Sequence, residues 1–242
     1  MADKKIITQE QVMQLLDKLY EGSIQGIQKV SPPITELASN YLEKHTNVES
    51  AAKSFVNYQI AKCTTSGFLT GLGGLITLPI TIPANIGSVL YVQMRMIACL
   101  AYMGGFDTNS DQVQTLVYAC LAGISIDQLL KNVGIQFGLK FTTAMVKKIP
   151  GTVLTKINQK VGFRLLTKFG TKGLINIGKA VPIVGGIISG SFDLVETKII
   201  ADRAYKMFIN GDLSVLSSEN CKDDSMIETT DNIEDIEVEI NE

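Results

Sequence analysis

The sequence predicts an all-α protein: a compact helical bundle with Gly/Pro-interrupted apolar helices at its centre and a disordered acidic C-terminal tail. Three observations favour this fold class. Apolar residues recur at helical spacing along most of the 242 residues, and residues that cap helices stand between these segments. Alternation of the β type is confined to the very end of the chain. With 45% hydrophobic and 19% charged residues, the chain is too apolar to be disordered throughout.

Three helices are expected at the start of the chain. Thr8 and Gln11 have the spacing of a capping box, Ser31-Pro32-Pro33 precedes a second helix, and Asn47 can cap a third. The side chains predicted to face inward are Val12, Leu15, Leu16 and Leu19, then Ile34, Leu37, Ala38, Tyr41 and Leu42, then Ala51, Ala52, Phe55 and Tyr58. Residues 1–50 are interpreted as an N-terminal helical segment, ahead of a core domain over residues 51–211.

An uncharged stretch of 32 residues follows, from Cys63 to Met94. Its length exceeds that of a membrane-spanning helix, but only half of it is strongly hydrophobic, and Pro79 and Pro83 would break a straight span. Two short helices separated at residues 77–83 are the better prediction. Burial of this hairpin in protein is favoured over entry into a bilayer, because its glycines and hydroxyls are costly in lipid; both readings stay open.

Three further helices are expected. The uncharged run Gln112–Ile126 is predicted to be a core helix, a basic amphipathic helix should follow Pro150-Gly151 and end near Gly170, and residues 187–209 form the last helix before Asn210-Gly211. GxxxG spacing, which lets two helices approach closely, occurs at Gly67/Gly71, Gly134/Gly138 and Gly186/Gly190. Residues 212–242 are rich in Ser, Asp and Glu and are expected to be a disordered acidic tail.

The near-neutral total charge hides a strong asymmetry. Residues 1–218 carry 21 Lys and Arg against 14 Asp and Glu, a net charge of +7, whereas residues 219–242 carry one Lys against ten acids, a net of −9. Residues 128–192 contain ten basic residues and no acid. An acid-free block differs from an ordinary solvated face, where both signs alternate. Fold-back of the acidic tail on the basic block is one hypothesis that this asymmetry raises.

The basic residues near the expected amphipathic helix are candidates for binding a membrane. Four residues turn a helix by about 400°, so residues spaced by four stay on one side for several turns. A solvated face of a core helix is the alternative interpretation. The candidates, of which residues 156 to 172 are spaced by four, are Lys140, Lys147, Lys148, Lys156, Lys160, Arg164, Lys168, Lys172 and Lys179.

Little in the sequence supports catalysis or metal binding. His45 is the single histidine and is expected to be solvated, and the four cysteines form no CxxC pair, so no metal and no cofactor is predicted. No P-loop, GxSxG or HExxH motif occurs. An enzyme is therefore less favoured than a non-enzymatic protein, although a buried polar cluster is conceivable from Arg95, Asp107, Asp127 and Asp193.

The cysteine pattern fits a reducing compartment, and residues 1–30 lack the apolar region of a signal peptide, so a cytoplasmic location is expected.

Several motifs between residues 55 and 210 resemble the EcsC family. They are Gly67-Phe68, Gly71-Leu72-Gly73-Gly74-Leu75-Ile76-Thr77-Leu78-Pro79, Ile82-Pro83, Gln93-Met94-Arg95-Met96-Ile97-Ala98, Gly105-Phe106-Asp107, Lys148-Ile149-Pro150-Gly151, Lys156-Ile157-Asn158-Gln159-Lys160-Val161-Gly162 and Pro182-Ile183-Val184-Gly185-Gly186. The resemblance implies a bacterial protein near the cytoplasmic side of the membrane, since the family is named for a protein encoded beside ABC-transporter subunits. It implies no catalytic residue.

The leading hypothesis is a non-enzymatic protein, peripheral on the cytoplasmic face of the cell membrane. Its expected partners are an anionic membrane surface and, through the family resemblance, membrane transporter subunits. Nucleic-acid binding is an alternative, because the same basic stripe can follow phosphates, but the stripe lacks an aromatic array for stacking bases. An enzyme with a buried Arg/Asp site is the other alternative.

Overall fold

The structure is a computed structural model that describes residues 8–28, 31–63, 84–135, 140–169, 188–218 and 221. Every regular element within these ranges is a helix, and a single isolated bridge between Ile27 and Ser31 is the one β-type pairing there. The all-α prediction is confirmed. The break expected at residues 77–83 lies outside the described residues, as do Gly67 and Gly71 and most of the helix expected before the break. The helix expected after the break is present and begins at Ala84.

The N-terminal helices form as the sequence predicts. Helix α1 spans Gln9–Gln25, α2 Ile34–Leu42 and α3 Val48–Cys63. The capping box at Thr8 is present, and all four residues of the predicted α1 stripe are buried. Tyr58 on α3 was expected to face inward, but 55% of its surface is exposed, so that prediction is wrong.

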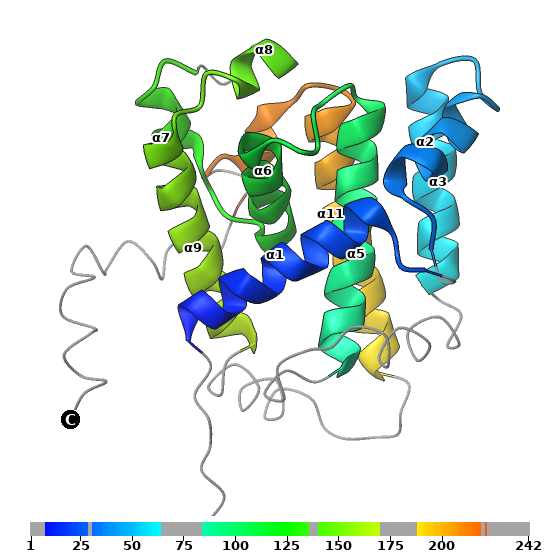
Figure 1. Cartoon of the computed structure of the whole chain (residues 1–242), viewed down its shortest axis with the longest axis horizontal. Coiled ribbons are helices and arrows are strands. Elements are labelled where there is room, and N and C mark those ends of the chain that lie inside the picture. Colours follow the sequence, from blue (N-terminus) through cyan, green and yellow to red (C-terminus); the bar gives the residue numbers. More distant parts are fainter. Residues whose placement is uncertain are drawn as a thin grey trace, which may run out of the picture.

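Helix α5 (Ala84–Met103) is the central helix of the described bundle (Figure 1). Helices α1, α2, α3 and α6 pack against it, and so does α11 (Ile188–Phe208). Residues 90–101 are buried on all sides of the helix, which explains why this stretch carries a single charge. A helix that is apolar all round belongs in a core.

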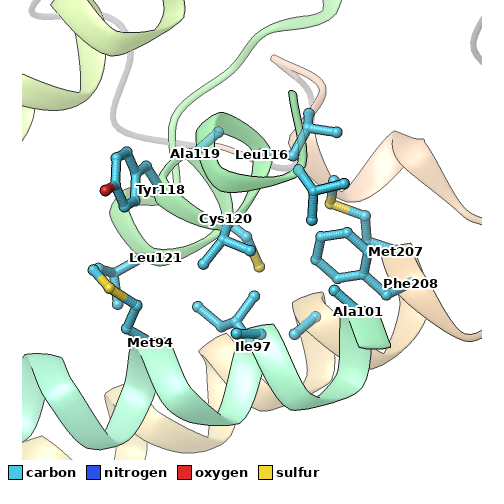
Figure 2. Packing of buried hydrophobic residues seen from close by; sticks show 14 of the residues in the cluster. Met94, Ile97, Ala101, Leu116, Tyr118, Ala119, Cys120, Leu121, Met207 and Phe208 are labelled. Carbon is cyan, nitrogen blue, oxygen red and sulfur yellow. The ribbon is translucent and has the colours of Figure 1, made fainter. Parts of the chain in front are cut away.

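Helix α6 (Asp111–Ala122) lies directly against α5 and α11. Figure 2 shows its Cys120 close to Ile97 of α5, with Met207 and Phe208 of α11 beside them. The predicted helix reached Ile126, but α6 ends at Gly123, whose φ of 65° is the left-handed conformation that closes a helix. A new short helix, α7 (Asp127–Lys131), begins four residues later.

The second half of the chain adds α8 (Thr143–Val146) and the long α9 (Gly151–Phe169). The predicted start of α9 after Pro150 is confirmed. Gly134 does not lie in a helix but in a turn with φ of 78°, so its expected role in close helix packing is wrong. Gly138 lies outside the described residues, and so does Gly186 of the last expected pair.

The folded chain continues beyond the expected tail boundary at residue 212. After α11, a 3-10 helix η1 (Leu213–Leu216) buries Leu213 and Leu216, and Cys221 is buried as well. Residues 222–242 lie outside the described residues. One hydrophobic core runs from Val12 to Leu216, so the N-terminal helices share the core of the segment that follows them.

No helix within the described ranges combines the length and the apolar character that crossing a membrane requires.

Candidate functional site

Helix α9 is amphipathic, and its apolar side belongs to the core of the protein. This side is formed by residues three and four apart and packs against α6, α1 and α7. The buried residues are Val153, Leu154, Ile157, Val161 and Leu165. In the folded protein this apolar side is therefore covered by other helices. The apolar side of α9 is therefore not available to a lipid surface in the described fold.

The basic side of α9 faces outward to different degrees. Lys156 is exposed, whereas Lys160 and Arg164 are half-buried. Each of these residues directly precedes a buried one, and successive side chains on a helix are about 100° apart. For Lys156 and Lys160, this position places the aliphatic stem beside the buried side and leaves the charged end toward the surface.

Three more exposed lysines precede α9, in the segment that contains α8. Lys140, Lys147 and Lys148 are exposed, while the intervening Val146 and the following Ile149 are buried. Two apolar anchors thus hold this turn against the body and direct its lysines outward. We call the five residues Lys140, Lys147, Lys148, Lys156 and Lys160 the basic surface.

The segment with Lys140 is fixed by its neighbour Phe141. The Phe141 ring stacks on Phe106 with 5.7 Å between ring centroids, and its N–H donates to the Gly211 carbonyl at 2.7 Å. Lys140 therefore projects from an anchored backbone.

Within the described part of the chain, none of the five lysines of the basic surface forms a salt bridge. The C-terminal end of the predicted stripe differs, because Lys168 forms a salt bridge with Glu196 of α11. Lys172 and Lys179 lie outside the described residues. The structure thus keeps five of the nine predicted candidates as exposed or half-exposed positive charges without an acidic partner there.

Arg95 lies in the core, where it joins α5 to the connection between α1 and α2. Only 7% of its surface is exposed, and its guanidinium donates to the main-chain carbonyls of Ser23, at 2.8 Å, and Pro32. Burial lowers the pKa of Arg95, while the neighbouring Tyr91 favours the charged form. In the described part of the chain, main-chain carbonyl oxygens rather than carboxylates accept from this buried charge.

Asp127 has a separate set of partners at the start of α7. Its carboxylate accepts hydrogen bonds from Ser125 Oγ at 2.6 Å, Lys131 Nζ at 3.2 Å and Ser218 Oγ at 3.3 Å. Burial raises its pKa, but the hydrogen bonds from Ser125 and Lys131 outweigh that effect, and the pKa lies below its ordinary value. The arrangement stabilises a charged aspartate that ties the C-terminal segment to α7.

The four residues of the predicted polar cluster do not gather in one place. Asp107 is exposed in the turn before α6, where its Oδ1 accepts from the Asn109 N–H at 3.0 Å. Arg95 and Asp127 have the separate partners given above. Asp193 lies on α11, and its side chain is outside the described residues. The three described members stabilise separate parts of the fold and do not surround a shared cavity.

His45 and a hollow beside the α1–α2 connection offer little chemistry. His45 Nδ1 lies 2.8 Å from the Tyr41 carbonyl oxygen, one turn earlier. The hollow of about 640 Å³ is lined by residues without a titratable side chain: Gln25, Gly26, Ile27, Gln28, Ser31, Pro32 and Pro33. Within the described ranges, no three His, Cys, Asp or Glu side chains come together as metal ligands.

A polar network between α1 and α6 was not predicted. The Tyr118 hydroxyl donates to Asp17 at 2.8 Å, and Gln114 donates to both of them. Asp17 is 97 positions from Gln114 and 101 from Tyr118, and no local pattern links α1 to α6 in this way. The Lys168–Glu196 pair escaped prediction for the same reason.

The chain matches no protein-family model, no curated protein and no solved structure.

Proposed function

We propose that this protein is a non-enzymatic peripheral membrane protein that binds anionic lipid through the basic surface, on the cytoplasmic face of the cell membrane. The observation that carries the proposal is the group of five lysines on α9 and the segment before it, none of which has an acidic partner in the described structure. An ordinary solvated face intersperses both signs of charge. A surface of one sign attracts surfaces of the other.

The docking mode is electrostatic, because the apolar residues of α9 are buried in the bundle. Each Lys near an anionic leaflet contributes about 1 kcal/mol, and the attraction falls within a Debye length of about 10 Å at 0.1 M salt. Five lysines therefore suffice for reversible binding at low and moderate ionic strength. Binding is expected to weaken steeply as salt is added.

The resemblance to EcsC proteins supports a more specific role, as an accessory to a membrane transport process. Membrane transporter subunits are the protein partners that this role implies. The support for this part of the proposal is the set of motifs between residues 55 and 210.

Co-sedimentation of the full chain with vesicles tests the proposal. Vesicles of phosphatidylcholine with phosphatidylserine are compared with vesicles of phosphatidylcholine alone, over a salt series. Binding to the anionic vesicles at low salt, lost at high salt, is the expected result. No binding at low salt, or equal binding to both kinds of vesicle, contradicts the proposal.

A pair of charge-reversal variants shows which surface is responsible. Lys147→Glu/Lys148→Glu removes two members of the basic surface and should weaken partitioning by at least about tenfold, given about 1 kcal/mol for each lysine. Lys44→Glu/Lys53→Glu makes the same change of charge at exposed sites near α2 and on α3, across the body from α8 and α9 (Figure 1). Equal losses in the two variants would show that total charge, not this surface, drives binding.

Two additional measurements distinguish other outcomes. Retention on vesicles at high salt and alkaline pH contradicts electrostatic docking and instead indicates insertion of the stretch around residues 63–106. Tighter binding of a short DNA duplex than of anionic vesicles, at the same salt, contradicts the membrane proposal in favour of nucleic-acid binding.

A further inference from the structure

The C-terminal part of the described chain runs beside the segment that carries the basic surface. The Gly211 carbonyl accepts from the Phe141 N–H at 2.7 Å, directly next to Lys140. Five residues later, the Leu216 carbonyl accepts from the Ile126 N–H at 3.0 Å, just before α7. These contacts place Gly211 beside Phe141 and Leu216 beside Ile126.

The point from which the remaining chain departs is also fixed. Ser218 donates to the Asp127 carboxylate at 3.3 Å, and the Cys221 N–H donates to the Ser217 carbonyl at 3.0 Å. Cys221 is buried and lies within electrostatic range of Cys120 on α6. Both α6 and α7 pack against α9. The chain beyond residue 221 therefore starts from elements in direct contact with the basic helix.

The charge of that remaining chain is opposite to the charge of the basic surface. Residues 222–242 contain nine acids and one lysine, a net charge of −8. The acids are Asp223, Asp224, Glu228, Asp231, Glu234, Asp235, Glu237, Glu239 and Glu242. We call residues 222–242 the acidic tail. A block of like charges of this density repels itself and is typical of a segment that interacts with an oppositely charged surface.

The length of the acidic tail is sufficient for it to reach every lysine of the basic surface. Its 21 residues span at most about 70 Å when extended. The 19 residues of α9 cover roughly 28 Å. A tether of this length also keeps its end near its origin, at an effective concentration in the millimolar range. Weak charge pairing is then enough for the acidic tail to occupy the basic surface.

We propose that the acidic tail docks on the basic surface of the same molecule and competes there with anionic lipid. The docking itself follows from the exit point and the charges; the competition with lipid rests on the proposed function. The tail would thereby set a threshold, so that only membranes with enough anionic lipid displace it. Ionic strength weakens both contacts, because both are electrostatic.

Lysine acetylation followed by mass spectrometry tests the docking without a membrane. Initial rates are compared between the full chain and a tail-neutral variant, in which the nine acids of the acidic tail become Asn or Gln. At low salt, Lys147, Lys148 and Lys156 should react at least about threefold more slowly in the full chain, and the difference should vanish near 1 M salt, where the Debye length is about 3 Å. Lys44 and Lys53 serve as reference sites in both proteins and should be unchanged. Equal rates at Lys147, Lys148 and Lys156 in the two proteins at low salt overturn the proposal.

Dilution and vesicle binding separate the remaining outcomes. Protection that persists on dilution supports docking within one molecule, whereas protection lost on dilution assigns the tail to a second copy and contradicts it. The tail-neutral variant should also bind phosphatidylserine-containing vesicles more tightly than the full chain. If the lysines are protected but neither protein binds these vesicles, the docking stands and the proposed membrane function fails.

Discussion

The guanidinium of Arg95 donates to the main-chain carbonyl of Ser23, 72 positions earlier, at 2.8 Å. A second donor of the same guanidinium reaches the Pro32 carbonyl. The two carbonyls lie at either end of the connection between α1 and α2. One buried side chain on the central helix therefore holds both ends of a loop that brings the N-terminal helices onto the core.

Replacing Arg95 tests this function of the residue. Arg95→Met keeps the length of the side chain but leaves both carbonyls without a donor, and we expect the free energy of unfolding to fall by about 3 kcal/mol, since each buried group left unsatisfied costs about 1–3 kcal/mol. Equilibrium unfolding in urea measures the change.

Arg95→Lys is the matched control, because it retains the positive charge but lacks the planar fork that reaches two acceptors. It should lose an intermediate amount of stability. If Arg95→Met is as stable as the parent protein, the contacts to Ser23 and Pro32 contribute nothing. If Arg95→Lys has the same free energy of unfolding as the parent protein, the positive charge rather than the forked geometry of the guanidinium stabilises the fold.

Asp127 predicts a specific dependence of stability on pH. The pKa of this carboxyl lies below its ordinary value of 3.8, so its charged form is stabilised in the folded state. The contribution to stability is then complete above about pH 5 and is lost as the pH falls through 3.8 toward the lower, folded-state pKa. The free energy of unfolding of the parent protein, compared with that of Asp127→Asn, should show a difference that is constant near neutrality and shrinks below pH 4.

Ser125→Ala tests whether the hydrogen bond from Ser125 lowers the pKa of Asp127. It removes the 2.6 Å hydrogen bond that favours the charged form of Asp127, so the carboxyl pKa, followed by NMR, should rise relative to the parent protein. An unchanged pKa in this variant would show that the contact does not stabilise the carboxylate.

Local signals in the sequence were enough to predict much of the fold. The capping box at Thr8 and the start of α9 after Pro150 each depend on residues within one or two turns. Gly123 also carried a local signal for the end of α6, but the uncharged run beyond it suggested a longer helix. Tyr58 was wrongly predicted to be buried. Burial depends on where the partner helices end, and the spacing of residues within α3 does not reveal that.

The candidate site could also be predicted only where its signals are local in the sequence. The basic residues of α9 follow from a period of four, but whether its apolar side meets lipid or protein depends on α1, α6 and α7. The contact between Ser218 and Asp127 joins residues 91 positions apart. No short-range pattern records such a contact, so the path of the C-terminal segment beside α7 emerged from the fold alone.

The buried cysteines should be unreactive in the native protein. Burial raises the pKa of Cys99 to about 12 and that of Cys120 to about 12, and the thiol rather than the thiolate then dominates at pH 8. In a Cys63→Ser background, labelling with Ellman's reagent should be slow at Cys99 and Cys120, and it should accelerate on addition of urea. Cys221 is buried but lies outside the hydrophobic core cluster that contains Cys99 and Cys120. It should react before either of them, because segments with fewer core contacts open at a lower free energy. Rapid native labelling of Cys120 would contradict the packing of α6 against α5 and α11.

Gly211 lets the chain turn from α11 toward η1, and a matched pair of variants measures what that turn requires. Its φ is 72°, and a Cβ there would lie 2.7 Å from Lys140 Cγ and 3.0 Å from the Phe141 carbonyl oxygen. Gly134 has a similar φ of 78°, but a Cβ there would meet nothing within 4 Å. Gly134→Ala should therefore cost only the backbone strain, about 1 kcal/mol.

Gly211→Ala should cost at least about 1 kcal/mol more than Gly134→Ala in free energy of unfolding, because main-chain atoms of Phe141 must also shift. The hydrogen bond from the Phe141 N–H to Gly211 is then strained, and its amide should exchange with solvent faster than in the parent protein. Equal losses of stability in the two variants would mean that the space around Gly211 is not restrictive. In that case the contact that holds the C-terminal segment beside Lys140 would be looser than the 2.7 Å hydrogen bond indicates.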